Sequence, residues 1–91
     1  MEYEMECSIS GKVQGVGFRR FILARALEYG VVGYVCNTEE GAVEVVAQGK
    51  REVLESLLAH LQKGSIHAQV DDIEVRWHET LQDSLTDFTI R

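Results

Sequence analysis

The segment from residue 10 to residue 21 joins two different periodicities, and it constrains the fold more than any other part of the chain. Before it, apolar and polar residues alternate, which is typical of a strand with one buried face. After it, apolar residues recur at the spacing of an amphipathic helix. Gly11, Gly15 and Gly17 lie between the two patterns, and glycine adopts the backbone conformations that a tight connection needs. The segment therefore predicts a strand, a glycine-rich turn and the start of a helix.

This turn is a candidate anion-binding site, because a helix start offers unpaired N–H groups and the positive end of the helix dipole. Arg19 falls in the first helical turn, where a planar guanidinium group matches phosphate oxygens. A plain strand–helix connection is the alternative interpretation. Two well-known phosphate loops are excluded: Phe18 and Arg19 follow Gly17 where a Walker loop needs Lys and Ser or Thr, and Arg20 replaces the third glycine of a dinucleotide-binding loop.

The periodicities along the whole chain predict five strands and two helices, in the order β-α-β-β-α-β with a short last strand. Gly30 and Gly64 end the helices, and the short turn at 38–41 makes a hairpin of its flanking strands. The alternation of the fourth strand is interrupted at Asp71 and Asp72. The expected strands are 3–13, 31–37, 42–48, 69–78 and 85–91, and the expected helices are 18–29 and 50–63. This order predicts an α+β, ferredoxin-like βαββαβ sandwich, with two helices on one face of an antiparallel sheet and a short fifth strand.

The same patterns predict which side chains are buried. The odd positions of the first strand are expected in the core, and its even positions, such as Glu4, are expected in solvent. Leu85 and Phe88 are expected in the core, and His60 is expected at the surface. The buried residues expected from the first strand are Tyr3, Met5, Cys7, Ile9 and Val13.

The length of 91 residues suits a single domain, 1–91. No apolar run reaches the ~18 residues of a membrane span, and the N-terminus lacks a signal-peptide pattern, so a cytoplasmic protein without membrane association is expected. Cys7 and Cys36 are too few for a metal site and are expected to be free thiols. The three histidines share no metal-ligand spacing. No metal and no cofactor are expected.

The net charge of −6 argues against nucleic acid as a partner. Residues 7–27 contain no acidic residue but carry Lys12, Arg19, Arg20 and Arg25. This window has a charge of +4, which leaves −10 for the rest of the chain. A basic region within an acidic protein attracts a small anion while the remainder repels polyanions.

Asn37 ends the second expected strand, immediately before the hairpin turn. Asparagine is common in turns, and this alone explains its presence. Its amide group is also both a donor and an acceptor, so it can hold a water molecule beside a bound anion. Both interpretations stay open at this point.

Two long motifs resemble the signatures of the acylphosphatase family. The first is Gly-Lys-Val-Gln-Gly-Val-Gly-Phe-Arg at 11–19, and the second is Gly-Tyr-Val-Cys-Asn-Thr-Glu-Glu-Gly-Ala-Val-Glu at 33–44. The resemblance implies a βαββαβ domain that hydrolyses carboxyl–phosphate anhydrides without metal or cofactor. The chain departs from the family pattern at Glu40, where Asp or Asn is frequent, and at Gly64-Ser65, where Gly-Pro is usual.

The resemblance also implies roles for single residues. Arg19 would bind the phosphoryl group, Asn37 would orient the attacking water, and Arg20 would have no catalytic role and would point elsewhere. Substrate binding would be completed by the backbone of Gln14, Gly15, Val16, Gly17 and Phe18. The expected partners are a small-molecule acyl phosphate and inorganic phosphate, which is both product and competitive inhibitor. A monomer is expected.

Two other functions remain open from the sequence. One is a carbamoyl-phosphate-handling domain, like that at the start of hydrogenase-maturation proteins. The other is a non-catalytic, anion-binding regulatory domain. Turnover of benzoyl phosphate or acetyl phosphate separates these from an acylphosphatase. An RNA-binding domain of the same fold is disfavoured by the acidic charge and by the lack of an aromatic motif on the third strand.

Overall fold

The computed structural model describes residues 2–79 and 85–91, and its elements follow the order expected from the sequence. The helix at 18–29 and the strand at 69–78 have the predicted bounds. The strand at 43–49 is shifted by one residue at both ends, and the first strand, the second strand and the second helix are each one residue shorter at one end. The last strand is shorter than the expected 85–91. The elements are β1 (Tyr3–Lys12), α1 (Phe18–Tyr29), β2 (Val32–Asn37), β3 (Val43–Gly49), α2 (Arg51–Lys63), β4 (Gln69–His78) and β5 (Phe88–Ile90).

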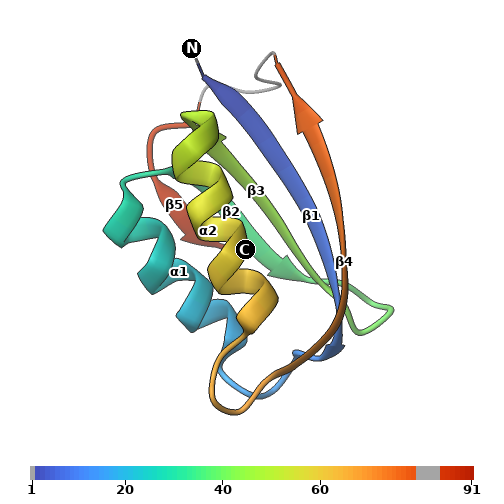
Figure 1. Ribbon diagram of the computed structural model, residues 1–91. Coiled ribbons are helices and arrows are strands. Elements are labelled where there is room, and N and C mark those ends of the chain that lie inside the picture. The colour runs from blue at the N-terminus through green and yellow to red at the C-terminus, as the bar shows by residue number, and fades with distance from the viewer. Residues whose placement is uncertain (1, 80–84) are drawn as a thin grey trace.

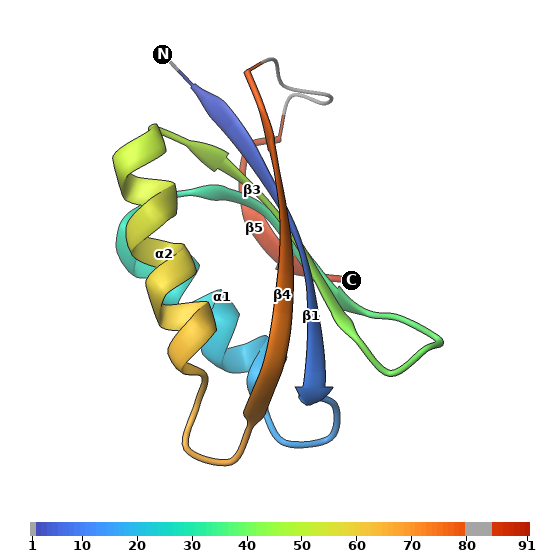
Figure 2. The ribbon, with the colours of Figure 1, turned by 45° about the vertical axis from the view of Figure 1, so that its right-hand side comes forward.

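The strands form one sheet in the order β4-β1-β3-β2-β5. Both helices cover one face of this sheet, and the opposite face carries no helix (Figures 1 and 2). The four longer strands pair antiparallel as expected, whereas the short fifth strand, β5, pairs with β2 in parallel. A hairpin turn sets the direction of β3 relative to β2, but β5 follows β4 at the far edge of the sheet, so no such turn fixes its direction.

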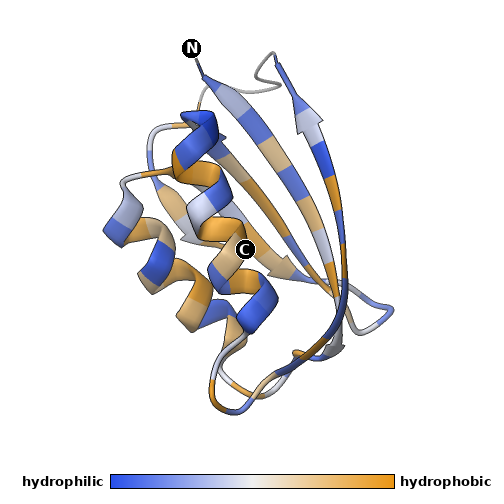
Figure 3. Ribbon diagram, viewed as in Figure 1, coloured by the Kyte–Doolittle hydropathy of each residue, from blue (hydrophilic) through white to orange (hydrophobic). Residues whose placement is uncertain are grey.

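The core lies between the helices and the covered face of the sheet. The apolar stripes of α1 and α2 alternate with polar residues, as the hydropathy colouring shows (Figure 3). Phe88 is buried as expected, whereas Tyr3 and Leu85 are only partly buried. Each fully buried leucine stabilises the fold by about 1.5–3 kcal/mol relative to an exposed one. The core side chains include Met5, Ile9, Ile22, Ala26, Val35, Val45, Leu54, Leu57 and Leu61.

Glu4 contradicts the expectation that the even positions of β1 face solvent. Glu4 is only 1% exposed, and the Nε2 group of Gln48 donates a hydrogen bond of 2.9 Å to its Oε1 atom. The two residues are direct partners in the pairing of β1 with β3. The alternation of a strand shows which side chains share a face, but a polar pair that bonds across strands can be buried on either face.

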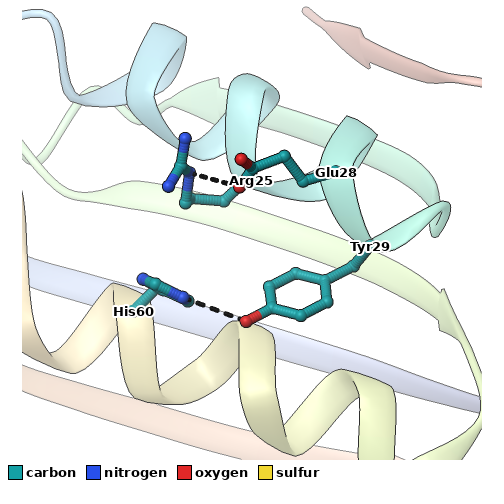
Figure 4. Close-up of polar contacts among 4 residues, drawn as sticks. All are labelled: Arg25, Glu28, Tyr29 and His60. Carbon is teal, nitrogen blue, oxygen red and sulfur yellow. Dashed lines mark hydrogen bonds and ion pairs between the residues drawn. The ribbon is translucent and has the colours of Figure 1, made fainter.

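His60 is partly buried and links the two helices. Its Nε2 atom lies 3.0 Å from the hydroxyl of Tyr29 at the end of α1 (Figure 4). The two rings also contact each other, with centroids 5.7 Å apart. Helical periodicity places a residue on one face of its own helix, but it does not show how close the neighbouring helix lies.

The interrupted alternation at Asp71 and Asp72 corresponds to a β-bulge. Ser10 pairs with Asp72 while the next residue, Gly11, pairs with Val70, so Asp71 has no partner on β1. An extra residue of this kind shifts the side-chain alternation by one position. The bulge therefore explains the irregular sequence pattern at the start of β4.

Substitution of Gly33 by alanine is expected to cause a large loss of stability. Its φ is +149°, and an added Cβ atom would lie 1.8 Å from the backbone oxygen of Val46 on the adjacent strand. The positive φ alone costs about 1–3 kcal/mol, and the backbone of β3 must also move. We expect Gly33→Ala to lower the free energy of unfolding by at least ~3 kcal/mol, measured by urea denaturation with circular dichroism.

Gly30→Ala is the matched control for this prediction. Gly30 has a φ of +69°, and an added Cβ would meet nothing within 4 Å. This variant therefore experiences backbone strain without a steric overlap, and we expect a loss of about 1 kcal/mol. Equal losses for the two variants would contradict the assigned role of the close contact between β2 and β3.

Cys7 and Cys36 are both free, as expected. Cys7 pairs with Val45 of β3, and Cys36 pairs with Glu44. Because successive residues of a strand point to opposite faces, the two thiols lie on opposite sides of the sheet. Burial, with a smaller contribution from Glu6, raises the pKa of the Cys7 thiol from about 9 to about 12.

The two thiols are expected to differ strongly in reactivity toward a disulfide reagent at pH 8. Cys7 is 1% exposed and its raised pKa keeps it a neutral thiol, whereas the thiolate is the reactive form. One thiol per chain should react in the native protein and two after unfolding. Assigning the native label by peptide mass should give Cys36, and labelling of Cys7 first would refute the prediction.

Candidate active site

The loop between β1 and α1 is shaped by two glycines. Gly15 and Gly17 have φ values of +73° and +78°, and Gly17 is the residue that precedes the first helical residue, Phe18. An added Cβ at either glycine would meet nothing within 4 Å. The backbone conformation, and not a lack of space, therefore requires glycine at these positions.

The start of α1 presents backbone donors without a competing negative charge. The first N–H to bond back into the helix belongs to Phe21, which donates to the oxygen of Gly17 at 3.1 Å. Within residues 2–79 and 85–91, the N–H groups of residues 15–20 donate to no protein acceptor, and no side chain caps the helix. The first turn of α1 also contains no acidic residue. Such a helix start favours a bound anion.

A pocket of about 270 Å³ adjoins this loop. Arg19 lines it as the sequence leads one to expect, and no carboxylate belongs to the described residues that line it. Arg20, which is exposed, also borders the pocket. The pocket spans the beginning of the helix. Its wall is formed by Val13, Gly15, Gly17, Phe18, Arg19, Arg20 and Ile90.

Gln14 uses its side chain to hold the loop against the β2–β3 turn. Its Nε2 group donates to the carbonyl oxygens of Thr38, at 2.9 Å, and Ala42, at 2.8 Å. Both hydrogens of the amide are thereby used. Gln14 and Val16 belong to the glycine loop but are not among the described residues that line the pocket.

Asn37 is the last residue of β2 and is exposed. It pairs with Val43 and does not itself line the pocket. The residue that follows it, Thr38, accepts the hydrogen bond from Gln14, so the structure places the segment of Asn37 beside the glycine loop. In the described part of the chain, the side-chain amide of Asn37 makes no hydrogen bond.

The positive charge of Arg19 influences the pKa of Cys36, near the end of β2. Burial and the carboxylate of Glu44 raise the pKa of Cys36, while Arg91 and Arg19 act to lower it. Cys36 immediately precedes Asn37 in the chain. Arg19 and the end of β2 are therefore electrostatically coupled, although they belong to separate elements.

Ile90 is a pocket residue that the sequence does not reveal. It lies in β5, and it borders the pocket because β5 runs parallel to β2 beside the start of α1. The sequence indicates a closing strand, but its position next to β2 depends on long-range pairing that a three-residue strand does not encode. Ile90 is 37% exposed, which is high for a large apolar side chain.

The described residues contain no group of three His, Cys, Asp or Glu side chains placed to hold a metal ion. None of the described helices has both the length and the apolar character needed to cross a membrane. The site therefore consists of backbone donors, two arginines and an apolar wall.

The fold is that of an α+β domain with a pocket at the start of its first helix, and the exposed backbone donors and arginines there suit a small anion. The family model of the acylphosphatases matches residues 5–90. An acylphosphatase of Thermus thermophilus is 49% identical over 71 residues, which cover 78% of this chain and 81% of that protein.

Solved structures agree with this match. The crystal structure of acylphosphatase from Bacillus subtilis superposes with a TM-score of 0.94 at 32% identity, covering 98% of each chain. A structure of full-length HypF, in a phosphate- and nucleotide-bound form, has a TM-score of 0.84 at 26% identity, covering 100% of this chain and 12% of that one. The chain belongs to the acylphosphatase family. Members of this family are hydrolases that act on small acyl phosphates.

Proposed function

We propose that this acylphosphatase cleaves its substrate in the pocket beside α1, where Arg19 and the backbone of residues 14–18 bind the phosphoryl group and Asn37 orients the attacking water. The observation that carries the proposal is the helix start itself. It combines N–H groups that have no acceptor within the described chain with Arg19 at the wall of a pocket free of carboxylates.

The reaction needs little more than these groups. The water oxygen attacks phosphorus, the bond between phosphorus and the carboxylate oxygen breaks, and the carboxylate leaves with that electron pair. The products are the carboxylate and inorganic phosphate. Because the transition state is loose and the leaving group is good, positioning and charge stabilisation supply most of the catalysis. The proton of the attacking water passes to a phosphoryl oxygen, so the site needs no separate general base.

Asn37 suits the water-orienting role because its amide is exposed and uncommitted within the described chain. An amide can accept a hydrogen bond from the water and donate one to a phosphoryl oxygen. Gln14 supports this arrangement by fixing the turn after Asn37 to the loop before Arg19, through its bonds to Thr38 and Ala42. Two segments far apart in the chain are thus held in one place.

The likeness to HypF supports a second candidate, a domain that handles a related mixed anhydride such as carbamoyl phosphate. That protein contains this fold as 12% of its chain. Turnover of benzoyl phosphate, followed by its ultraviolet absorbance, separates the two functions. Rapid hydrolysis supports the acylphosphatase assignment, whereas hydrolysis of carbamoyl phosphate alone supports the second candidate.

Inorganic phosphate is expected to compete with substrate, because the proposed site recognises the phosphoryl group that substrate and product share. Added phosphate should raise the KM for benzoyl phosphate and leave kcat unchanged. Initial rates over a grid of substrate and phosphate concentrations check this result. A fall in kcat at saturating substrate would place phosphate at another site.

A further inference from the structure

The pocket is bordered by two consecutive arginines and by an apolar side. Arg19 and Arg20 both line it, together with the helix start, while Ile90, Val13 and Phe18 give it an apolar side. A phosphoryl group bound by Arg19 and the backbone donors fills only part of a volume of about 270 Å³. The remaining volume of the pocket is available to the acyl group.

We propose that Arg20 selects acyl phosphates whose acyl group carries a second negative charge, such as a carboxylate. This inference rests on the proposed function of the pocket and assigns its substrate class. The hydrocarbon part of the acyl group packs against the apolar side, and the guanidinium group of Arg20 pairs with the distal anion. Arg20 is thus a specificity residue and takes no part in the chemical step.

The state of the arginines in α1 supports this assignment. Arg25, one and a half turns further along, pairs with Glu28 at 3.1 Å (Figure 4) and lies 5.8 Å from the ring centroid of Phe21. Arg20 is exposed, and neither Arg20 nor Arg19 has an ion-pair partner among the described residues. Arg25 therefore interacts with other residues of its own helix, whereas the guanidinium donors of Arg20 are available to a ligand.

The negative net charge of the chain increases the importance of a nearby cation for binding an anionic acyl group. The net charge of the chain is −6, so a substrate with an additional negative charge is repelled by the protein as a whole. A planar guanidinium group at the pocket wall offsets this repulsion and offers two parallel hydrogen bonds to a carboxylate.

The test compares benzoyl phosphate with 3-carboxybenzoyl phosphate and 4-carboxybenzoyl phosphate, whose rigid rings prevent attack of the carboxylate on its own anhydride. The measured quantity is the ratio of kcat/KM for each carboxylated substrate to kcat/KM for benzoyl phosphate. Arg20→Gln should lower this ratio by about tenfold for at least one carboxylated substrate. Arg20→Lys should restore part of it, since a point charge keeps the attraction but not the paired hydrogen bonds.

Lys12→Gln is the matched control, because it removes one positive charge from the end of β1 at an exposed residue outside the pocket. Its ratio should stay near that of the parent protein. Equal ratios for the parent and Arg20→Gln, or an equal fall with Lys12→Gln, would overturn the inference. If the parent fails to hydrolyse benzoyl phosphate at all, it is the proposed function that fails, so the two failures are distinguishable.

Discussion

Arg19→Ala is expected to lower kcat/KM for benzoyl phosphate by at least ~10²-fold and to weaken inhibition by phosphate. Removing a single preorganised donor from a transition state commonly has an effect of this size. Arg19 lines the pocket without an ion-pair partner in the described part of the chain, so its charge is available to the phosphoryl oxygens. Arg19→Lys should recover little, because an ammonium group cannot reproduce two parallel hydrogen bonds.

Steady-state kinetics and phosphate inhibition constants for the variants check this expectation. Lys12→Ala is a suitable control, since it removes an equal charge from an exposed position outside the pocket. Circular dichroism should show that all variants are folded. If Arg19→Ala keeps the activity of the Lys12 control, Arg19 is not the phosphate-binding residue.

Asn37→Ala is expected to abolish most of the activity while leaving phosphate binding nearly intact. If Asn37 orients the water, its loss removes an interaction that acts on the attacking nucleophile and not on the phosphoryl group. The variant should therefore lower kcat far more than it raises KM, again by at least ~10²-fold. The inhibition constant of phosphate should remain within a few-fold of the parent value.

Glu40→Ala is the matched control for Asn37, because Glu40 is exposed in the same β2–β3 turn and departs from the usual family residue. Its kinetics should be close to those of the parent protein. Full activity in Asn37→Ala, or an equal loss of phosphate binding and rate, would contradict the proposed role. The contrast between Arg19 and Asn37 thus separates binding of the phosphoryl group from activation of water.

Local patterns were sufficient to predict the helices and internal strands. The bounds of α1 follow from its apolar spacing and from Gly17 and Gly30 at its two ends, which are properties of neighbouring residues. The parallel pairing of β5 with β2 and the burial of Glu4 depend on residues distant in the chain. No local pattern reports such contacts, so these two features could be learned only from the structure.

In the candidate site, too, the features set by neighbouring residues could be predicted and those set by distant residues could not. The glycine loop and Arg19 lie together in the sequence, and the succession of strand, turn and helix start predicts an anion site there. The second segment, with Asn37, is brought beside them by Gln14, a contact over 24 residues of sequence. The position of Arg20 and Ile90 at the pocket wall was missed because it depends on how the start of α1 meets β5.

The bulge at Asp71 has a consequence for how copies of this protein meet. Strand β4 is an edge of the sheet, and a free edge can recruit the edge of another molecule. Here the residue without a partner on β1 breaks the regular spacing of backbone groups, and exposed charges at Asp71, Asp72, Glu74 and Arg76 follow along the strand. A second chain that aligned with this edge would meet a misplaced backbone and a row of carboxylates. The β4 edge is thereby poorly suited to pairing with an edge strand of another molecule.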